Sequence, residues 1–315
     1  VARRASSRLG APRPSAHPMN PDRPSRTAEG AALLRALHVH LDDAPLLFED
    51  RAVRDLLPTP ARMALRPLPP PWKRALRRRE RLRPAAAAMR GQIVLRARFA
   101  EDALEAALAA GVDQVLILGA GLDTTALRRP ARLRGVALWE IDHPATQAWK
   151  RRRLGGRAEG RTRFVPVVFG EDDLAAALLA AGVDAGRPMF VNWLGCTYYL
   201  RPTATAATLG ALATLAAPGS EIALDYWTDR AVPDLPSRLL LGGVRVALAL
   251  QQEPLLGLLA PGAFARLAAT AGWEVIEDLD AGAQRMRWLA GRRDTLAVPG
   301  FAHLARLRPM GGQGR

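Results

Sequence analysis

The chain of 315 residues is 49% hydrophobic and 24% charged, which is typical of a soluble globular protein with one large domain and an appendage, or two small domains. Its single cysteine, Cys196, excludes an intrachain disulfide and a cysteine zinc cluster, and no apolar run approaches the ~18 residues that a membrane helix needs. We therefore expect no membrane span, no metal site and, by default, a cytoplasmic location.

The net charge of +15, from 45 basic and 30 acidic residues, is compatible with a nucleic acid or an anionic surface as a partner. The basic residues are nearly all arginine, however, in a chain that is also rich in Ala, Gly and Pro. Such a bias often reflects a genome rich in G and C. The charge alone therefore identifies no partner.

The N-terminal part of the chain is expected to be a tail followed by a helical cap. Residues 1–25 hold five Arg and five Pro but no aromatic residue, so we predict a disordered basic tail. Apolar residues then recur at three- and four-residue steps, which predicts an amphipathic helix. The members of this pattern are Ala31, Leu34, Leu37 and Leu41. Helical fragments broken by prolines follow, and we assign 26–112 as a helical N-terminal cap region.

The densest basic run is 72–83, W-K-R-A-L-R-R-R-E-R-L-R, which lies between two prolines. One interpretation is a surface that binds phosphates. The simpler one, which we favour, is a solvated helix or loop whose Trp72, Leu76 and Leu82 touch the body of the protein. No aromatic residues interleave with the arginines to stack on bases.

From residue 113 to residue 308, apolar strands alternate with helices. The predicted strands are 114–118, 136–141, 164–169, 189–194, 221–227, 273–279 and 301–308, with a tail at 309–315. A helix from Leu95 to Ala107 precedes them, and an apolar insertion at 235–259 is expected to be helical. This alternation predicts an α/β domain with a doubly wound, mostly parallel sheet of about seven strands.

A glycine turn, Gly119-Ala120-Gly121, follows the first strand, and Asp142, about 20 residues later, comes just after the second strand. This is the spacing of a ribose-binding acid in a nucleotide-binding fold. The dinucleotide fingerprint would have a small residue in place of Thr124, and no Gly-Lys-Ser/Thr sequence follows. S-adenosyl-L-methionine, with a ribose but no phosphate, therefore suits the turn best. The alternatives are NAD, which the lack of a Tyr-x-x-x-Lys pair disfavours, and a tight turn without a ligand.

These segments resemble the leucine carboxyl methyltransferase family, and most closely its bacterial branch of S-adenosyl-L-methionine-dependent methyltransferases. The resemblance covers nearly all of 26–308. The matching segments are 25–28, 95–102, 113–128, 140–150, 164–167, 193–200, 289–292 and 299–303. It implies a class I methyltransferase fold, a Rossmann-like doubly wound sheet. It says much less about the substrate.

The resemblance also implies roles for individual residues. Those implied in cofactor binding are Arg26, Arg96, Gly119, Ala120, Gly121, Asp123, Asp142 and Phe169. Arg96 would pair with the cofactor carboxylate, because a guanidinium can make a bidentate contact. Asp142 would hold the ribose, and Arg26 would close over the cofactor.

Two positions depart from the family pattern. Many relatives end the third strand on an Asp near the adenine, where this chain has Val168-Phe169. We expect Phe169 to stack on the ring, with Glu171 or Asp172 supplying the polar contact. Leu194 stands where eukaryotic carboxyl methyltransferases carry a Glu. Both differences bear on cofactor affinity.

The fourth strand ends on Asn192-Trp193-Leu194-Gly195, unlike the Asn/Asp-Pro-Pro-Tyr/Phe of enzymes that methylate nucleobase amines. This difference argues against nucleic acid as the substrate. Tyr198 and Tyr199 follow and are candidates for the acceptor pocket, with core packing as an equal alternative.

None of the histidines is a convincing catalytic base. We expect His143, before Pro144, to cap the next helix, and His38, His40 and His303 to be surface residues. Cys196 is expected to be a small buried apolar group.

The sequence therefore predicts an S-adenosyl-L-methionine-dependent methyltransferase that acts on a carboxylate or hydroxyl of a small, partly apolar metabolite. The apolar insertion 235–259 would line the acceptor pocket. The alternative is a protein of the same fold that binds nucleic acid or an anionic surface through its basic patches. Whether the protein is a monomer or a homodimer is left open.

Overall fold

The computed structural model describes residues 26–65, 69–82, 84–158, 160–230 and 232–311. The predicted disordered tail, 1–25, lies outside these ranges, as does the predicted C-terminal tail beyond residue 311.

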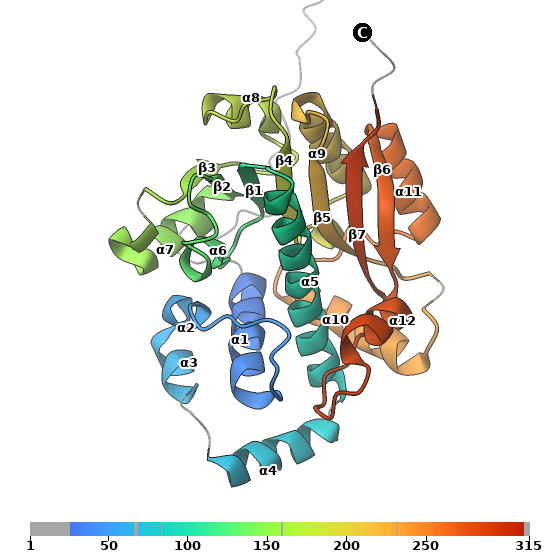
Figure 1. Cartoon of the computed structure of the whole chain (residues 1–315). Helices are drawn as coiled ribbons and strands as arrows, with labels where there is room; N and C mark the ends of the chain where they lie inside the picture. The colour runs from blue at the N-terminus through green and yellow to red at the C-terminus, as the bar shows by residue number, and fades with distance from the viewer. Residues whose placement is uncertain (1–25, 66–68, 83, 159, 231, 312–315) are drawn as a thin grey trace, which may run out of the picture.

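A seven-stranded sheet forms the centre of the molecule (Figure 1). The strands are β1 (Gln114–Leu118), β2 (Ala137–Asp142), β3 (Arg163–Pro166), β4 (Met189–Trp193), β5 (Glu221–Trp227), β6 (Trp273–Leu279) and β7 (Ala302–Pro309). Their order is β3-β2-β1-β4-β5-β7-β6, and β7 runs antiparallel to both of its neighbours. The predicted mostly parallel, doubly wound sheet is confirmed.

Helices connect and cover the strands. They are α1 (Arg26–Leu41), α2 (Val53–Leu56), α3 (Thr59–Ala64), α4 (Pro70–Arg81), α5 (Pro84–Ala109), α6 (Thr125–Arg128), α7 (Pro144–Leu154), α8 (Leu174–Ala180), α9 (Pro202–Leu215), α10 (Leu235–Leu250), α11 (Pro261–Thr270) and α12 (Ala281–Gln284). Shorter helical turns are η1 (Gly155–Ala158), η2 (Thr197–Tyr199) and η3 (Arg285–Leu289). None of the helices within the described ranges has both the length and the hydrophobicity to cross a bilayer.

Two predicted boundaries are wrong. The helical insertion ends at Leu250, so 251–259 is not helical as expected. The third strand ends at Pro166 rather than at 169. The Asp172 carboxylate accepts a hydrogen bond from the amide of Val168 at 2.7 Å and turns the chain there.

Both faces of the sheet are buried, which explains the continuous apolar runs of its strands. Leu116 and Leu118 of β1 pack with residues of α8, α9 and α11 in one core cluster. Val115 and Ile117 point to the other face, where they pack with residues of α5. Alternate side chains of a strand point to opposite faces, so β1 belongs to both cores.

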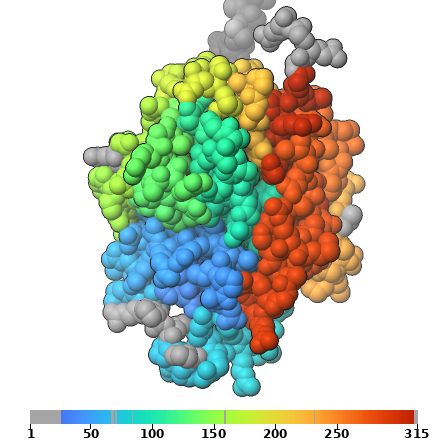
Figure 2. Space-filling model, viewed as in Figure 1, coloured from blue at the N-terminus to red at the C-terminus, as the bar shows by residue number. Residues whose placement is uncertain are grey.

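The N-terminal helices form a third cluster beside the sheet. Ala32 and Ala36 of α1 pack with Val53 and Leu56 of α2 and with Leu122, just after the glycine turn. In Figure 2 these helices (blue) pack directly against the first half of the sheet domain (green). The cap therefore contacts the edge of the sheet on which the glycine turn lies.

Two histidines that were expected at the surface are buried, and those predictions are wrong. His38 lies 2.7 Å from Asp42, and its other ring nitrogen accepts a hydrogen bond from the amide of Phe48. His303 lies 2.9 Å from Asp278, with Tyr226 stacked beside it. Both histidines are held by buried carboxylate or aromatic partners and take no part in the cavity described next.

Candidate functional site

A cavity of about 760 Å³ lies at the carboxyl ends of β1, β2 and β4, under α1 and beside α5. The eight residues implied in cofactor binding and the two candidate tyrosines all line it. These are Arg26, Arg96, Gly119, Ala120, Gly121, Asp123, Asp142, Phe169, Tyr198 and Tyr199. The carboxyl ends of parallel strands meet at one edge of a sheet, which brings residues distant in sequence together.

The glycine turn approaches the end of β4 so closely that a side chain does not fit. Gly119 and Gly121 have φ values of +60° and +47°, a region that favours glycine. A Cβ on Gly119 would lie 2.1 Å from the Sγ of Cys196. At Gly119 and Gly121 the turn therefore presents only its backbone to the cavity.

Asp142 is the acid at the end of β2 and faces the cavity. Its two carboxylate oxygens accept hydrogen bonds from the amides of Gly121, at 2.5 Å, and His143, at 2.6 Å. Burial raises the pKa of Asp142, while these two hydrogen bonds act to lower it. The bonds fix the carboxylate beside the turn and leave it acceptor capacity toward the cavity.

Neighbouring polar residues are already engaged. Glu140 is buried and pairs with Lys150 at 2.5 Å, so it is structural. The Nδ1 of His143 accepts a hydrogen bond from the amide of Ala145 at 3.2 Å, which confirms its predicted role as the cap of α7. Asp142 is therefore the carboxylate of β2 that is offered to a ligand.

Arg96 enters the cavity from α5 as part of a buried polar cluster. Its guanidinium donates to the hydroxyl of Tyr198 at 2.7 Å and lies 3.3 Å from the carboxylate of Asp225. Asp225 also accepts hydrogen bonds from Gln92 at 2.9 Å and from the amide of Gly195 at 2.5 Å. Asp225 thus fixes the position of the arginine.

Asp225 and Gln92 were not predicted from the sequence. The available signal was an acid in the middle of β5, E-I-A-L-D-Y-W, whose other central residues are apolar. Burying a carboxylate in a sheet is costly unless it is paired. Such an acid predicts a charged partner, although its identity depends on the packing of α5 against β5.

Three side chains that line the cavity carry a buried oxygen atom without a hydrogen-bond partner in the described part of the chain. They are Gln92 Oε1, Thr146 Oγ1 and Asn192 Oδ1. A buried oxygen without a partner is costly, and a ligand with donor groups would satisfy it.

The segment after β3 brings Phe169 to the cavity, together with Glu171. Asp172, the other residue expected to contact the adenine, instead uses its carboxylate to bond the amide of Val168. Asp123 lines the cavity and also accepts a hydrogen bond from the amide of Thr125 at 2.7 Å.

The tyrosines are held in different ways. Tyr198 is buried and stacks on Trp227 with ring centroids 4.1 Å apart, so core packing describes it well. Tyr199 is half-buried beside it. Burial raises the pKa of Tyr198, Tyr199 and Cys196, so all three stay protonated at neutral pH. They can donate hydrogen bonds but do not act as bases.

The side of the cavity between α5 and α10, here called its α10 side, is mostly apolar. It is lined by Met89, Ile93, Trp227, Val244, Leu248 and Leu256. The hydroxyl of Thr27, at the start of α1, donates to Glu253 in the segment after α10. Arg35 of α1 donates to the carbonyl of Leu122 at 2.6 Å. These contacts join the cap to both sides of the cavity.

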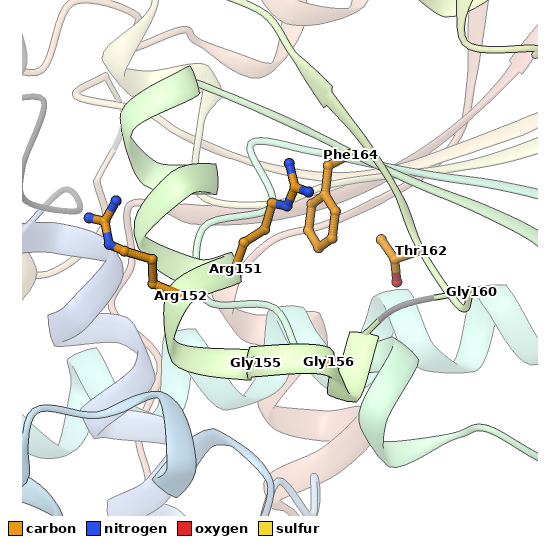
Figure 3. A pocket seen from close by; sticks show the side chains of 7 residues that line it. All are labelled: Arg151, Arg152, Gly155, Gly156, Gly160, Thr162 and Phe164. Atoms are coloured by element: carbon orange, nitrogen blue, oxygen red, sulfur yellow. The ribbon is translucent and has the colours of Figure 1, made fainter.

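A second hollow, of about 560 Å³, lies at the edge of the sheet between α7 and β3 (Figure 3). Arg151 points toward the ring of Phe164 there, with its guanidinium 5.4 Å from the ring centroid, whereas Arg152 points away. Among the residues that the structure describes, no carboxylate lines this hollow and none of the predicted site residues contributes to it. Within the described ranges, no group of three His, Cys, Asp or Glu side chains is placed to hold a metal.

Comparison with known proteins gives one family. The model of the leucine carboxyl methyltransferase family matches residues 28–213. A candidate S-adenosyl-L-methionine-dependent methyltransferase from Mycolicibacterium gilvum is 42% identical over 146 residues, which cover 45% of this chain and 46% of that protein. One from Streptomyces coelicolor is 36% identical over 63% of this chain and 67% of that protein. The alignments span under half of the length of several such relatives.

Solved structures share the fold. A candidate methyltransferase from Thermobifida fusca superposes with a TM-score of 0.53 and 16% identity, over 92% of this chain and 96% of that one. A DUF574-family protein from Streptomyces avermitilis gives a TM-score of 0.52 and 19% identity, over 70% and 85% of the two chains.

Proposed function

The chain belongs to the leucine carboxyl methyltransferase family, and from this premise we propose that it transfers a methyl group from S-adenosyl-L-methionine to an oxygen atom of a small, partly apolar metabolite. The cofactor is S-adenosyl-L-methionine, the methyl donor in the names of its relatives. The alternative of a protein that binds nucleic acid through its positive charge is not favoured, because the family membership and the large cavity both indicate an enzyme.

The observation that carries this proposal is the carboxylate of Asp142 beside the backbone of the glycine turn, inside the large cavity. A carboxylate accepts hydrogen bonds from both hydroxyls of a ribose, and the turn leaves room for a ligand next to it. The pairing of an acid with a turn that lacks a phosphate motif supports the sulfonium cofactor over a dinucleotide.

The polar cluster fits the amino-acid part of the cofactor. Arg96 supplies a guanidinium for the carboxylate, already oriented by Asp225. The unpartnered oxygens of Gln92 and Asn192 are placed to accept hydrogen bonds from an ammonium group. Phe169 presents a ring for the adenine. We propose these four residues, together with Asp142 and the glycine turn, as the cofactor site.

The chain's own contribution to the reaction is alignment and exclusion of water. When bound, the cofactor supplies a methyl group on a positively charged sulfur, which is displaced in line by a nucleophile. The cap, held by Thr27 and Arg35, shields this region, and the protonated Tyr199 orients an acceptor by donating a hydrogen bond.

A carboxylate is the acceptor that we favour. It is already ionised at neutral pH and needs no general base, whereas a hydroxyl benefits from one. Neither tyrosine can serve as that base. The apolar residues on the α10 side of the cavity, such as Val244 and Leu248, favour an acceptor molecule that is largely hydrophobic.

The test is a transfer assay with S-adenosyl-L-methionine that carries a labelled methyl group, offered to paired carboxylic acids, alcohols, phenols and amines of increasing chain length. We expect label in an ester that mild base releases, with a preference for the longer apolar acids. The rate should rise with pH through the acceptor's own pKa, about 4, and then stay level. Label that appears only in amines or in oligonucleotides would contradict the proposal.

The division into a cap, 26–112, and a cofactor domain, 113–308, remains a prediction. So does the cytoplasmic location.

A further inference from the structure

Helix α4 is oriented with its polar side toward the body of the protein. Lys73 donates to the carbonyl of Asp42 at 3.0 Å, and Arg77 donates to the carbonyl of Leu41 at 2.7 Å. Glu80 pairs with the buried Arg90 of α5. Lys73, Arg77 and Glu80 recur at steps of four and three residues, so one face of the helix makes all of these contacts.

The large apolar residues of this helix, and the one that follows it, are exposed to solvent. Trp72 is 65% exposed and Leu76 is 40% exposed, and Leu82, which follows the last turn, is 83% exposed. The expected packing of Trp72 and Leu82 on the body is therefore not observed. Because the polar side chains already occupy the inner face, the apolar ones are left outside.

Arginines lie next to these exposed apolar residues. Arg74, Arg78, Arg79 and Arg81 are all exposed. In Figure 1 the helix lies at the end of the molecule farthest from α8, and it meets the rest of the chain at α1 and α5. The outward face, defined as these four arginines with Trp72, Leu76 and Leu82, is thus an unpartnered surface among the described residues.

A soluble amphipathic helix normally buries its apolar residues, so the exposed Trp72 and Leu76 favour a partner outside the chain. Tryptophan and leucine together with arginine on one short helix are typical of a helix that lies in the headgroup region of a bilayer. The arginine stems can cover apolar surface while their guanidinium groups reach lipid phosphates.

We propose that α4 docks the protein on the surface of an anionic lipid bilayer, with Trp72 and Leu76 at headgroup depth. Charge complementarity selects this occupant. A second copy of the same face would bring arginine against arginine, and the segment 1–25, with its five arginines, would be repelled in the same way. Nucleic acid would match the charge but would leave Leu76 and Leu82 in water, with a single aromatic residue to stack on a base. The inference does not depend on the proposed activity.

The experiment is co-sedimentation of the full chain with vesicles of phosphatidylcholine alone or of equal parts phosphatidylcholine and phosphatidylglycerol. We expect binding to the anionic vesicles only, weakened by salt. The double variant Trp72→Ala/Leu76→Ala should lower the partition coefficient about tenfold, and Arg78→Ala/Arg79→Ala should lower it by a similar factor.

The matched control replaces an exposed leucine and an exposed arginine elsewhere, Leu179→Ala on α8 with Arg134→Ala, and should bind as the wild-type chain does. Equal melting temperatures of all variants would show that folding is unchanged. Binding that survives Trp72→Ala/Leu76→Ala undiminished would overturn the proposal. So would binding to a DNA duplex without binding to anionic vesicles.

Discussion

The Asp142→Ala variant is expected to bind S-adenosyl-L-methionine at least about 100-fold more weakly than the wild-type chain. Two hydrogen bonds from ribose hydroxyls to a carboxylate contribute about 3 kcal/mol or more, which corresponds to that factor in the dissociation constant. The substitution also removes the acceptor of the Gly121 amide, so the glycine turn loses its anchor. Titration calorimetry of the purified variant measures the effect.

Two further variants separate the role of Asp142 from general damage. Asp142→Asn keeps an acceptor oxygen beside Gly121 but loses the charge, so we expect an intermediate affinity. Asp113 lies just before the first residue of β1, at the end of the strand away from the cavity, and pairs with Arg187. Asp113→Ala should therefore leave the affinity for the cofactor unchanged. An unaltered dissociation constant for Asp142→Ala would remove Asp142 from the cofactor site.

The Arg90→Met variant is expected to lose about 3–5 kcal/mol of unfolding free energy, the usual cost of leaving buried charges without their partner. Arg90 is buried and donates to both carboxylate oxygens of Asp42 at 2.9 Å and to Glu80 at 2.7 Å. Asp42 also holds His38. The arginine therefore joins α1, α4 and α5, and its loss should loosen the cap. Urea unfolding, followed by circular dichroism, measures the change.

Arg98→Met is the matched control, since it lies on the same helix and also breaks an ion pair. Arg98 pairs with Asp102 at 2.8 Å, but the two side chains are 40% and 33% exposed. Exposed pairs of this kind contribute about 0–1 kcal/mol. If both variants lost the same stability, the buried network would not be what holds the cap.

The fold was predictable because its signals are local. Each strand of the sheet is a short apolar run, and glycines such as Gly111 and Gly182 stand just after the helices between them. The position of β7 between β5 and β6 was not predictable, because it depends on pairing between segments about 80 residues apart. The strand patterns carry no information on which strands pair with the last one.

The candidate site was predictable where residues lie at strand ends, as Gly119 and Asp142 do, because the topology brings those ends together. Asp225 was missed because its partners, Gln92 and Arg96, are on a helix about 130 residues away. The predicted packing of Trp72 and Leu82 against the body was wrong for a related reason. The sequence of α4 has a polar and an apolar side, and the acceptors on α1 decided which one faces inward.

The most direct test of the central claim is titration calorimetry of the wild-type chain with S-adenosyl-L-methionine, its demethylated product S-adenosyl-L-homocysteine, and NAD in parallel. We predict saturable binding of the first two, which share the ribose, adenine and amino-acid groups that the cavity matches. We predict no binding of NAD, because the turn lacks the small residue that a pyrophosphate needs, with Thr124 in its place. Binding of NAD without binding of S-adenosyl-L-methionine would contradict the account.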